Sequence, residues 1–249
     1  MLSLGFLAIA VVDFFLLIWA VKMCIRYRTA SLYLATIPLT LLWYDNVTIA
    51  IGGLLGEGQP LLAMNYVRFI AHYALLPASI VAVATMTQQA GFKIGQIKIG
   101  KINVMIAVFI GIAVYFAWHD LTLFSQATFY PSCFADTLRY TTRIAEYTAC
   151  SPDADIGAGS SIPPIPAISM SLMMLILGIA LWIKKGWKWL ALGTAIALPF
   201  FGVPYSSTGG IFSNAGEPII TGSIVATAAW LSGWRPGADS NEQSSKQTG

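Results

Sequence analysis

In this chain of 249 residues, 57% are hydrophobic and only 10% are charged, whereas a soluble globular domain carries roughly 25% charged residues. The composition excludes a water-soluble fold and indicates one membrane domain. The formal net charge of +3 comes from cations that flank apolar runs. Because no Lys/Arg stripe interleaved with aromatic residues runs along the chain, we expect a lipid bilayer and not nucleic acid as its partner.

Seven apolar segments are long enough to cross a bilayer, which requires about 20 mostly apolar residues. They cover residues 2–21, 30–54, 61–86, 103–123, 166–184, 187–206 and 216–232. The first segment lacks the positive region that precedes a signal-peptide core, so we expect an uncleaved span. The pattern predicts an all-α, polytopic bundle of seven transmembrane helices over residues 1–234, followed by a disordered tail over residues 235–249.

The distribution of cations predicts the orientation of the bundle, because short cytoplasmic connections collect Lys and Arg. The connections after the first, third and fifth segments carry Lys22, Arg26, Arg28, Lys93, Lys98, Lys101, Lys184, Lys185 and Lys188. The alternate connections carry few cations or none. We therefore expect the N-terminus outside and the C-terminus in the cytoplasm, in a multi-pass protein of a plasma or inner membrane.

The long connection over residues 124–165 falls on the outer, oxidising side and contains Cys133 and Cys150, while Cys24 falls on the cytoplasmic side. We therefore predict a Cys133–Cys150 disulfide. Residues 136–147, between the two cysteines, have helical spacing and predict a short surface helix. A connection of this length is expected either to cover a site as a lid or to dock another protein.

Ionisable side chains inside the bilayer cost about 2.5–3.5 kcal/mol each to insert and therefore point to a functional site. Most of those in this chain fall in the outer half. Asn65, Arg68 and His72 have i, i+3, i+7 spacing and share one helix face. Asp45 and Asn46 lie on the preceding segment at similar depth, so we expect Asp45 to pair with Arg68.

Two interpretations of this pair follow from the sequence. In the first, Asp45 and Arg68 only fix the register of two helices. In the second, they line an outward-facing pocket, where Asp45 and His72 exchange protons and Arg68, with Asn46 and Asn65, binds a substrate head group.

The remaining polar groups have structural alternatives. Glu217 fits a helix-capping pattern together with Asn214, and its other interpretation is a catalytic role. His119 and Asp120 are expected at a solvated helix end. Asp13 lies near the middle of the bilayer, where a lone carboxylate would be protonated, and is expected to be a neutral hydrogen-bonding acid. With two histidines and no zinc-ligand spacing, we expect neither a metal nor another cofactor.

The leading hypothesis is an intramembrane enzyme that acts by acid/base chemistry on a lipid or isoprenoid substrate, with Asp45, His72 and Glu217 as catalytic residues. In size and span count the chain resembles small membrane-embedded terpene cyclases. The alternatives are a transporter or channel for a small solute, and a non-catalytic assembly subunit that docks a protein through residues 124–165.

Overall fold

The computed structural model describes residues 1–157, 159, 162 and 164–236. The chain is 73% helical, as the all-α prediction requires. The helices are α1 (Leu2–Tyr27), α2 (Ala30–Leu55), α3 (Gln59–Leu75), α4 (Ala78–Gln89), α5 (Val104–Ser125), α6 (Ile165–Lys185), α7 (Trp189–Phe201), α8 (Tyr205–Thr208) and α9 (Ile211–Leu231), with two 3-10 turns, η1 (Lys93–Gln96) and η2 (Glu146–Thr148).

Five segments within the described residues are long and apolar enough to cross a membrane: α1, α2, α3 continued by α4, α5 and α6. These segments make the chain a membrane protein by length and composition. Helix α7 is apolar but has only 13 residues.

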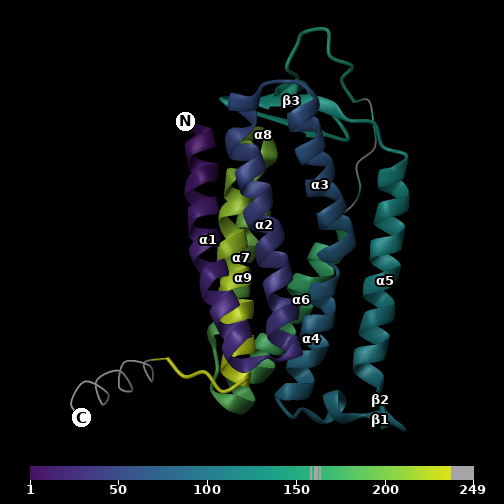
Figure 1. The fold of residues 1–249 in the computed structure, drawn as a ribbon, viewed down its shortest axis with the longest axis vertical. Helices are drawn as coiled ribbons and strands as arrows, with labels where there is room; N and C mark the ends of the chain where they lie inside the picture. The colour runs from purple at the N-terminus through teal and green to yellow at the C-terminus, as the bar shows by residue number, and fades with distance from the viewer. Residues whose placement is uncertain (158, 160–161, 163, 237–249) are drawn as a thin grey trace, which may run out of the picture.

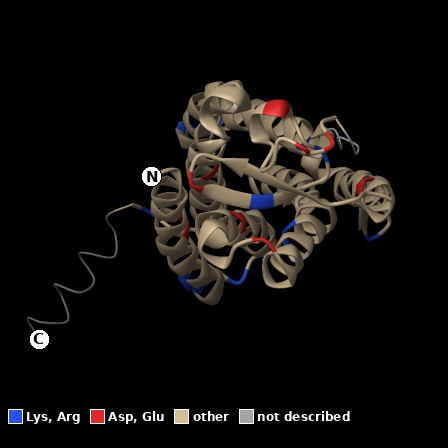
Figure 2. Cartoon of the chain, turned by 90° about the horizontal axis from the view of Figure 1, so that it is seen from above, with Lys and Arg blue, Asp and Glu red and all other residues tan. Residues whose placement is uncertain are grey.

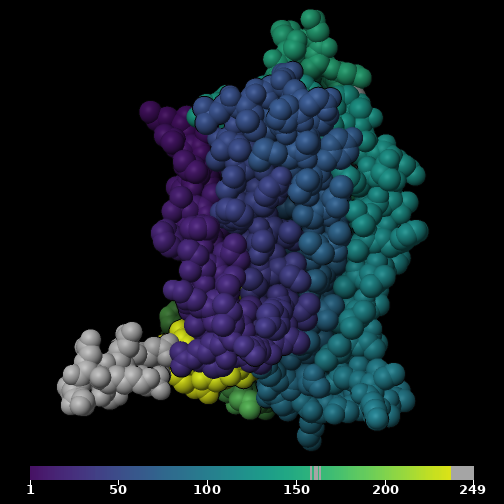
Figure 3. Space-filling view, viewed as in Figure 1, coloured from purple at the N-terminus to yellow at the C-terminus, as the bar shows by residue number. Residues whose placement is uncertain are grey.

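The long helices stand side by side as an upright bundle, with the N-terminus at the upper end in Figure 1. Helix α1 packs against α2 and α9, and α2 also packs against α3 and α4. Helices α6, α7 and α9 close the far side of the bundle, while α5 packs on α3 and α4. Helices α1, α2, α3 and α5 form one continuous face in the space-filling view of Figure 3.

One predicted segment, residues 61–86, is divided into two helices. Helix α3 ends at Leu75 and α4 begins at Ala78, because Pro77 between them has no backbone N–H to continue the helical hydrogen bonds. The division changes the direction of the chain below the polar residues of α3. The main apolar core is formed by residues of α1, α2, α4, α6, α7 and α9. Trp187 and Trp230 stack with ring centroids 4.8 Å apart.

The predicted surface helix over residues 136–147 is wrong. Strands β3 (Tyr130–Phe134) and β4 (Thr137–Thr141) form an antiparallel hairpin with Cys133 opposite Leu138. Ala135, in the two-residue turn, adopts a left-handed conformation with φ 51°, which helical continuation does not allow. A second two-stranded sheet, β1 (Lys98–Ile99) with β2 (Ile102–Asn103), lies at the opposite end of the molecule.

The predicted Cys133–Cys150 disulfide is present and ties β3 to the segment that follows the hairpin. Figure 2, viewed from the upper end, shows the hairpin lying across the helices. The hairpin is close to α2 because Gly52 has no side chain: a Cβ there would lie 1.8 Å from the Leu138 carbonyl oxygen. The turn is also bonded to α1, since the Leu2 backbone N–H donates to Asp136 at 2.6 Å.

The last long helix begins earlier than predicted. Helix α9 starts at Ile211, after Gly209 and Gly210, both of which have positive φ, whereas the sequence pattern predicts a start at 216. Part of the connection expected at 207–215 is therefore helical. The tail prediction for residues 235–249 falls almost entirely on residues 237–249, which lie outside the described part of the chain.

Candidate functional site

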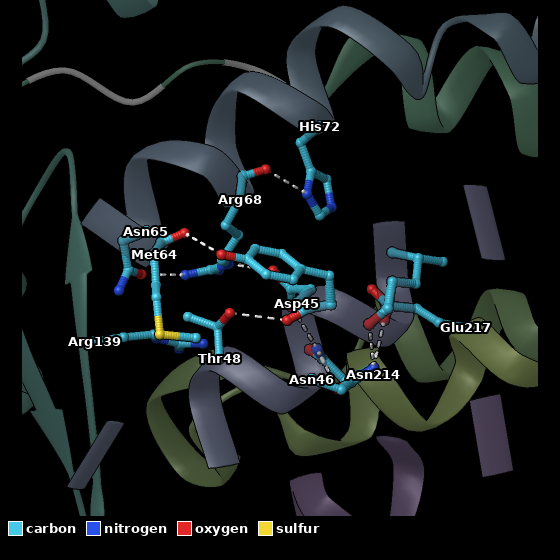
Figure 4. A network of polar contacts seen from close by, with 12 residues as sticks. Asp45, Asn46, Thr48, Met64, Asn65, Arg68, His72, Arg139, Asn214 and Glu217 are labelled. Carbon is cyan, nitrogen blue, oxygen red and sulfur yellow. Dashed lines mark hydrogen bonds and ion pairs between the residues drawn. The ribbon is translucent and has the colours of Figure 1, made fainter. Parts of the chain in front are cut away.

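The expected pair between α2 and α3 is present. Asp45 is 4% exposed, and Arg68 Nε donates to its Oδ1. Arg68 Nη1 also donates to Asn65 Oδ1 at 3.0 Å, so the guanidinium is held by its own helix as well as by α2 (Figure 4). The short connection between α2 and α3 makes the two helices antiparallel neighbours, which places Asp45 and Arg68 at one depth.

Asn214 of α9 extends this pair into a network that spans the bundle. Its Nδ2 donates to Asp45 Oδ2 at 3.1 Å and to Asn46 Oδ1 at 2.9 Å. Both oxygens of Asp45 are therefore occupied, one by Arg68 and the other by Asn214. The sequence pattern offered Asn214 only as a helix cap, and its contact with Asp45 depends on packing between distant segments.

On the other side of the network, the carboxyl groups of Asp13 and Glu217 both lie close to the side-chain amide of Asn46. Asn46 Nδ2 donates to Asp13 Oδ2 at 3.1 Å and lies 3.4 Å from Glu217 Oε2. Asp13 therefore takes part in a hydrogen bond through Oδ2, as the sequence led us to expect, although its Oδ1 has no hydrogen bond. The capping role expected of Glu217 is wrong, because Glu217 lies in the interior of α9 and a cap must lie at the end of a helix.

His72 lies one turn beyond Arg68 on the same face of α3. Its Nδ1 is 3.3 Å from the Arg68 carbonyl oxygen. Since a carbonyl oxygen can only accept, this hydrogen bond requires the proton on Nδ1 and leaves Nε2 as the basic nitrogen of the neutral ring. His72 lines the pocket described next, and the sequence pattern was sufficient to place it there.

These groups line a pocket of about 530 Å³ between α2, α3, α9 and the hairpin. A volume of this size falls in the usual range for small-molecule sites, about 300–1,000 Å³. The charged and titratable side chains in its lining are Asp45, Arg68, His72, Tyr73, Arg139, Arg143, Tyr147, Tyr205 and Glu217. Asn46 and Asn65, both fully buried, lie behind this lining and hold the groups that form it.

Arg139 is the buried cation of the pocket that the sequence pattern did not reveal. It lies on β4 and is only 6% exposed, whereas the sequence pattern placed it on a short surface helix of the outer loop. Burial, and then the charge of Arg68, lower the pKa of Arg139 to about 9, so the side chain remains a cation at neutral pH. Arg139 therefore belongs to the pocket and not to the loop surface, because it lies on a buried strand of the hairpin.

The His119–Asp120 pair lies on α5, apart from the pocket. His119 Nδ1 is 3.0 Å from Asp120 Oδ1, and the side chain of His119 is 42% exposed. Asp120 is 4% exposed, so the expectation of a solvated helix end holds for His119 but not for Asp120. Neither residue lines the pocket.

Among the described residues, no group of three His, Cys, Asp or Glu side chains converges in a way that could hold a metal ion. No protein family, curated protein or solved structure matches this chain. Its function must therefore be argued from the geometry of the pocket.

Proposed function

We propose that this chain is a seven-span membrane-embedded enzyme that acts by acid/base chemistry on a lipid or isoprenoid substrate in the pocket beneath the hairpin. The observation that carries the proposal is one cavity whose lining joins a basic imidazole, a carboxyl group and an arginine, His72, Glu217 and Arg68. Proton-transfer groups and a cation that positions a head group are the parts such a reaction requires.

The hydrogen bonds indicate different roles for the polar residues of the pocket. Both oxygens of Asp45 already accept hydrogen bonds, from Arg68 and Asn214. We therefore assign to Asp45 the task of holding the Arg68 guanidinium. Proton transfer falls to His72, through Nε2, and to Glu217, whose contact with Asn46 is long at 3.4 Å.

An apolar wall supports a substrate with a hydrocarbon part. Phe69 and Tyr73 of α3 line the same pocket, and both pack against Phe124 of α5, with ring centroids 6.0 and 5.4 Å away respectively. Phe129 adds a further ring 5.5 Å from Phe69. A pocket that combines polar groups with aromatic rings backed by further rings suits a molecule with a polar head and an apolar body.

The test compares His72→Gln and Glu217→Gln with the wild type in a host that lacks the protein. His119→Gln is the matched control, because His119 is the other histidine and lies outside the pocket. Membrane lipids are extracted and compared by untargeted mass spectrometry, and the amount of folded protein is measured by size exclusion in detergent. Removal of a general acid or base lowers a rate by about 10²–10⁴-fold.

We expect the amount of at least one lipid species to change when the host expresses the wild type or His119→Gln. Neither pocket variant should cause this change at equal folded yield. If conversion falls only in proportion to folded protein, the network serves helix register alone. If the wild type alters no lipid of the host, the enzymatic proposal is refuted.

The proposed topology has the N-terminus and the hairpin outside and the C-terminus in the cytoplasm, and it includes α7 and α9 as spans. It is supported by the lysine-rich connections at one end of the bundle and the disulfide at the other. A single cysteine introduced as Glu146→Cys should react with a membrane-impermeant maleimide on intact cells, and one introduced as Lys98→Cys should react only after lysis. The reverse result would overturn the orientation.

A further inference from the structure

The hairpin contributes cations to the pocket from the side opposite the helices. Arg139 on β4 and Arg143 just after it both line the cavity, as does Arg68 on α3. Arg143 is exposed at the rim, whereas Arg139 is buried. Three arginines around one cavity outnumber the two carboxylates in its lining, Asp45 and Glu217.

The contacts of Arg139 are with neutral groups. Its Nη2 donates to the Gly209 carbonyl oxygen at 3.3 Å, and its guanidinium lies 4.7 Å from the centre of the Tyr205 ring. Within the described part of the chain, no carboxylate lies within ion-pair distance of it. A guanidinium has five N–H donors, so these contacts leave most of them unused.

The unused donors face the cavity. Across the described residues, the one fully covered side-chain nitrogen or oxygen atom without a hydrogen bond is Asp13 Oδ1. The remaining nitrogens of Arg139 are therefore reached from the pocket that this side chain lines. Arg68 repels Arg139, and Asp45, which attracts Arg139, is already paired with Arg68. A buried cation with free donors and no ion-pair partner of its own is a site for an anion.

We propose that the hairpin side of the pocket binds a phosphate or diphosphate group, with Arg139 as its buried anchor and Arg143 at the rim. The planar fork of a guanidinium matches two oxygens of such a group. The hydroxyls of Ser132 and Ser213 line the same cavity and add donors for a group with several oxygens. The inference rests on the proposed function, because it names the head group of that enzyme's substrate.

A structural role for Arg139 is the competing explanation, since it also joins the hairpin to Gly209 and Tyr205. Arg235 provides a matched control. It too stacks on an aromatic ring, that of Trp230 at 5.5 Å, and donates to a backbone carbonyl, that of Trp230 at 2.9 Å. It follows the C-terminal end of α9 and does not line the pocket.

The experiment measures binding to the purified full chain in a neutral detergent. The probes are inorganic phosphate, diphosphate and mixed micelles of dioleoylphosphatidic acid, with dioleoylphosphatidylcholine as the zwitterionic control. Saturable shifts in the melting temperature report binding. The proteins are the wild type, Arg139→Gln, Arg139→Lys and Arg235→Gln.

We expect the wild type and Arg235→Gln to bind phosphatidic acid alike, Arg139→Gln to bind about tenfold or more weakly, and Arg139→Lys to bind with intermediate strength. If free diphosphate saturates the site as well as phosphatidic acid does, the natural ligand is a soluble anion and not a lipid head group, and the anion site is still supported. Equal binding by Arg139→Gln and the wild type, or no saturable shift with any anionic probe, would overturn the inference.

If Arg139→Gln does not fold, competition on the wild type decides: diphosphate must displace phosphatidic acid, and lack of competition refutes the site. The two proposals fail separately. Binding that depends on Arg139 without conversion of any lipid would refute only the enzyme. Conversion by wild type and Arg139→Gln at the same rate and KM would refute only the anion site.

Discussion

The position of the hairpin over the pocket depends on one glycine of α2. A Cβ on Gly52 would lie 1.8 Å from the Leu138 carbonyl oxygen, and real Cβ contacts are essentially never shorter than 3.0 Å. Gly52→Ala must therefore move β4 by about 1.2 Å or bend α2 by a similar amount. Because Leu138 precedes Arg139, the displacement reaches the pocket directly.

The expected change in the free energy of unfolding of Gly52→Ala follows from two opposing terms. Overpacking of a well-packed contact typically costs about 1–3 kcal/mol, while replacing a helical glycine by alanine gains about 0.5–1 kcal/mol. Gly52→Ala should therefore lower the free energy of unfolding by up to about 2.5 kcal/mol. At about 2–4 °C per kcal/mol for a chain of this size, its melting temperature should fall by several degrees.

The assay is thermal unfolding of the purified protein in detergent, with Gly111→Ala as the matched control. Gly111 lies inside α5, and a Cβ there would meet nothing within 4 Å. Gly111→Ala therefore changes helix propensity alone, and its melting temperature should rise or stay unchanged. If Gly52→Ala melts as high as Gly111→Ala, the hairpin is not seated on α2 by this contact and the reasoning fails.

Three further predictions concern the groups that hold the ends of the bundle. Replacing Cys133 and Cys150 by serine should lower stability by about 3 kcal/mol, because the disulfide closes a short loop; reductant should then have no further effect on melting, and an unchanged melting temperature would contradict this. The chain's amino group, then the Ser3 hydroxyl, hold the pKa of Asp136 well below its usual 3.8, so its ionised form stabilises the fold above that pH. The difference in melting temperature between the wild type and Asp136→Asn should be full at pH 7 and shrink as the pH falls below about 4, and a constant difference would contradict the assignment. Thr227→Val should cost about 1 kcal/mol by removing the acceptor of the Trp187 indole N–H, 2.9 Å away; melting as stable as the wild type would show that the indole finds another acceptor.

The helices could be predicted from the sequence because apolar length is a local property. The Asp45–Arg68 pair could also be predicted, since a short connection between two helices fixes which residues share a depth. The error at Glu217 has a physical cause: a proline after an acidic residue is typical of a first helical turn. In α9, Pro218 lies in the helix interior, which membrane bundles tolerate when neighbouring groups satisfy the freed carbonyl.

The hairpin could not be predicted because residues 136–147 have spacing compatible with a helix, and the strand pairing depends on contacts with distant residues. Arg139 was assigned to the loop surface for the same reason. Four of the five residues of β4 are buried, so the strand lacks the alternation of buried and exposed positions that would identify it. The signal that remains is composition, since Thr137–Thr141 includes two threonines and a tyrosine.

The network contains more than helix register requires. Asp45 and Arg68 form a neutral unit, and Asn65 and Asn214 complete its hydrogen bonds from α3 and α9. That unit would hold three helices together with no further ionisable group. His72 and Arg139 add titratable or charged groups to the same cavity, with backbone carbonyls as their hydrogen-bond acceptors. A buried cation without an ion-pair partner, such as Arg139, lowers stability, which is the physical reason for proposing that a ligand occupies the pocket.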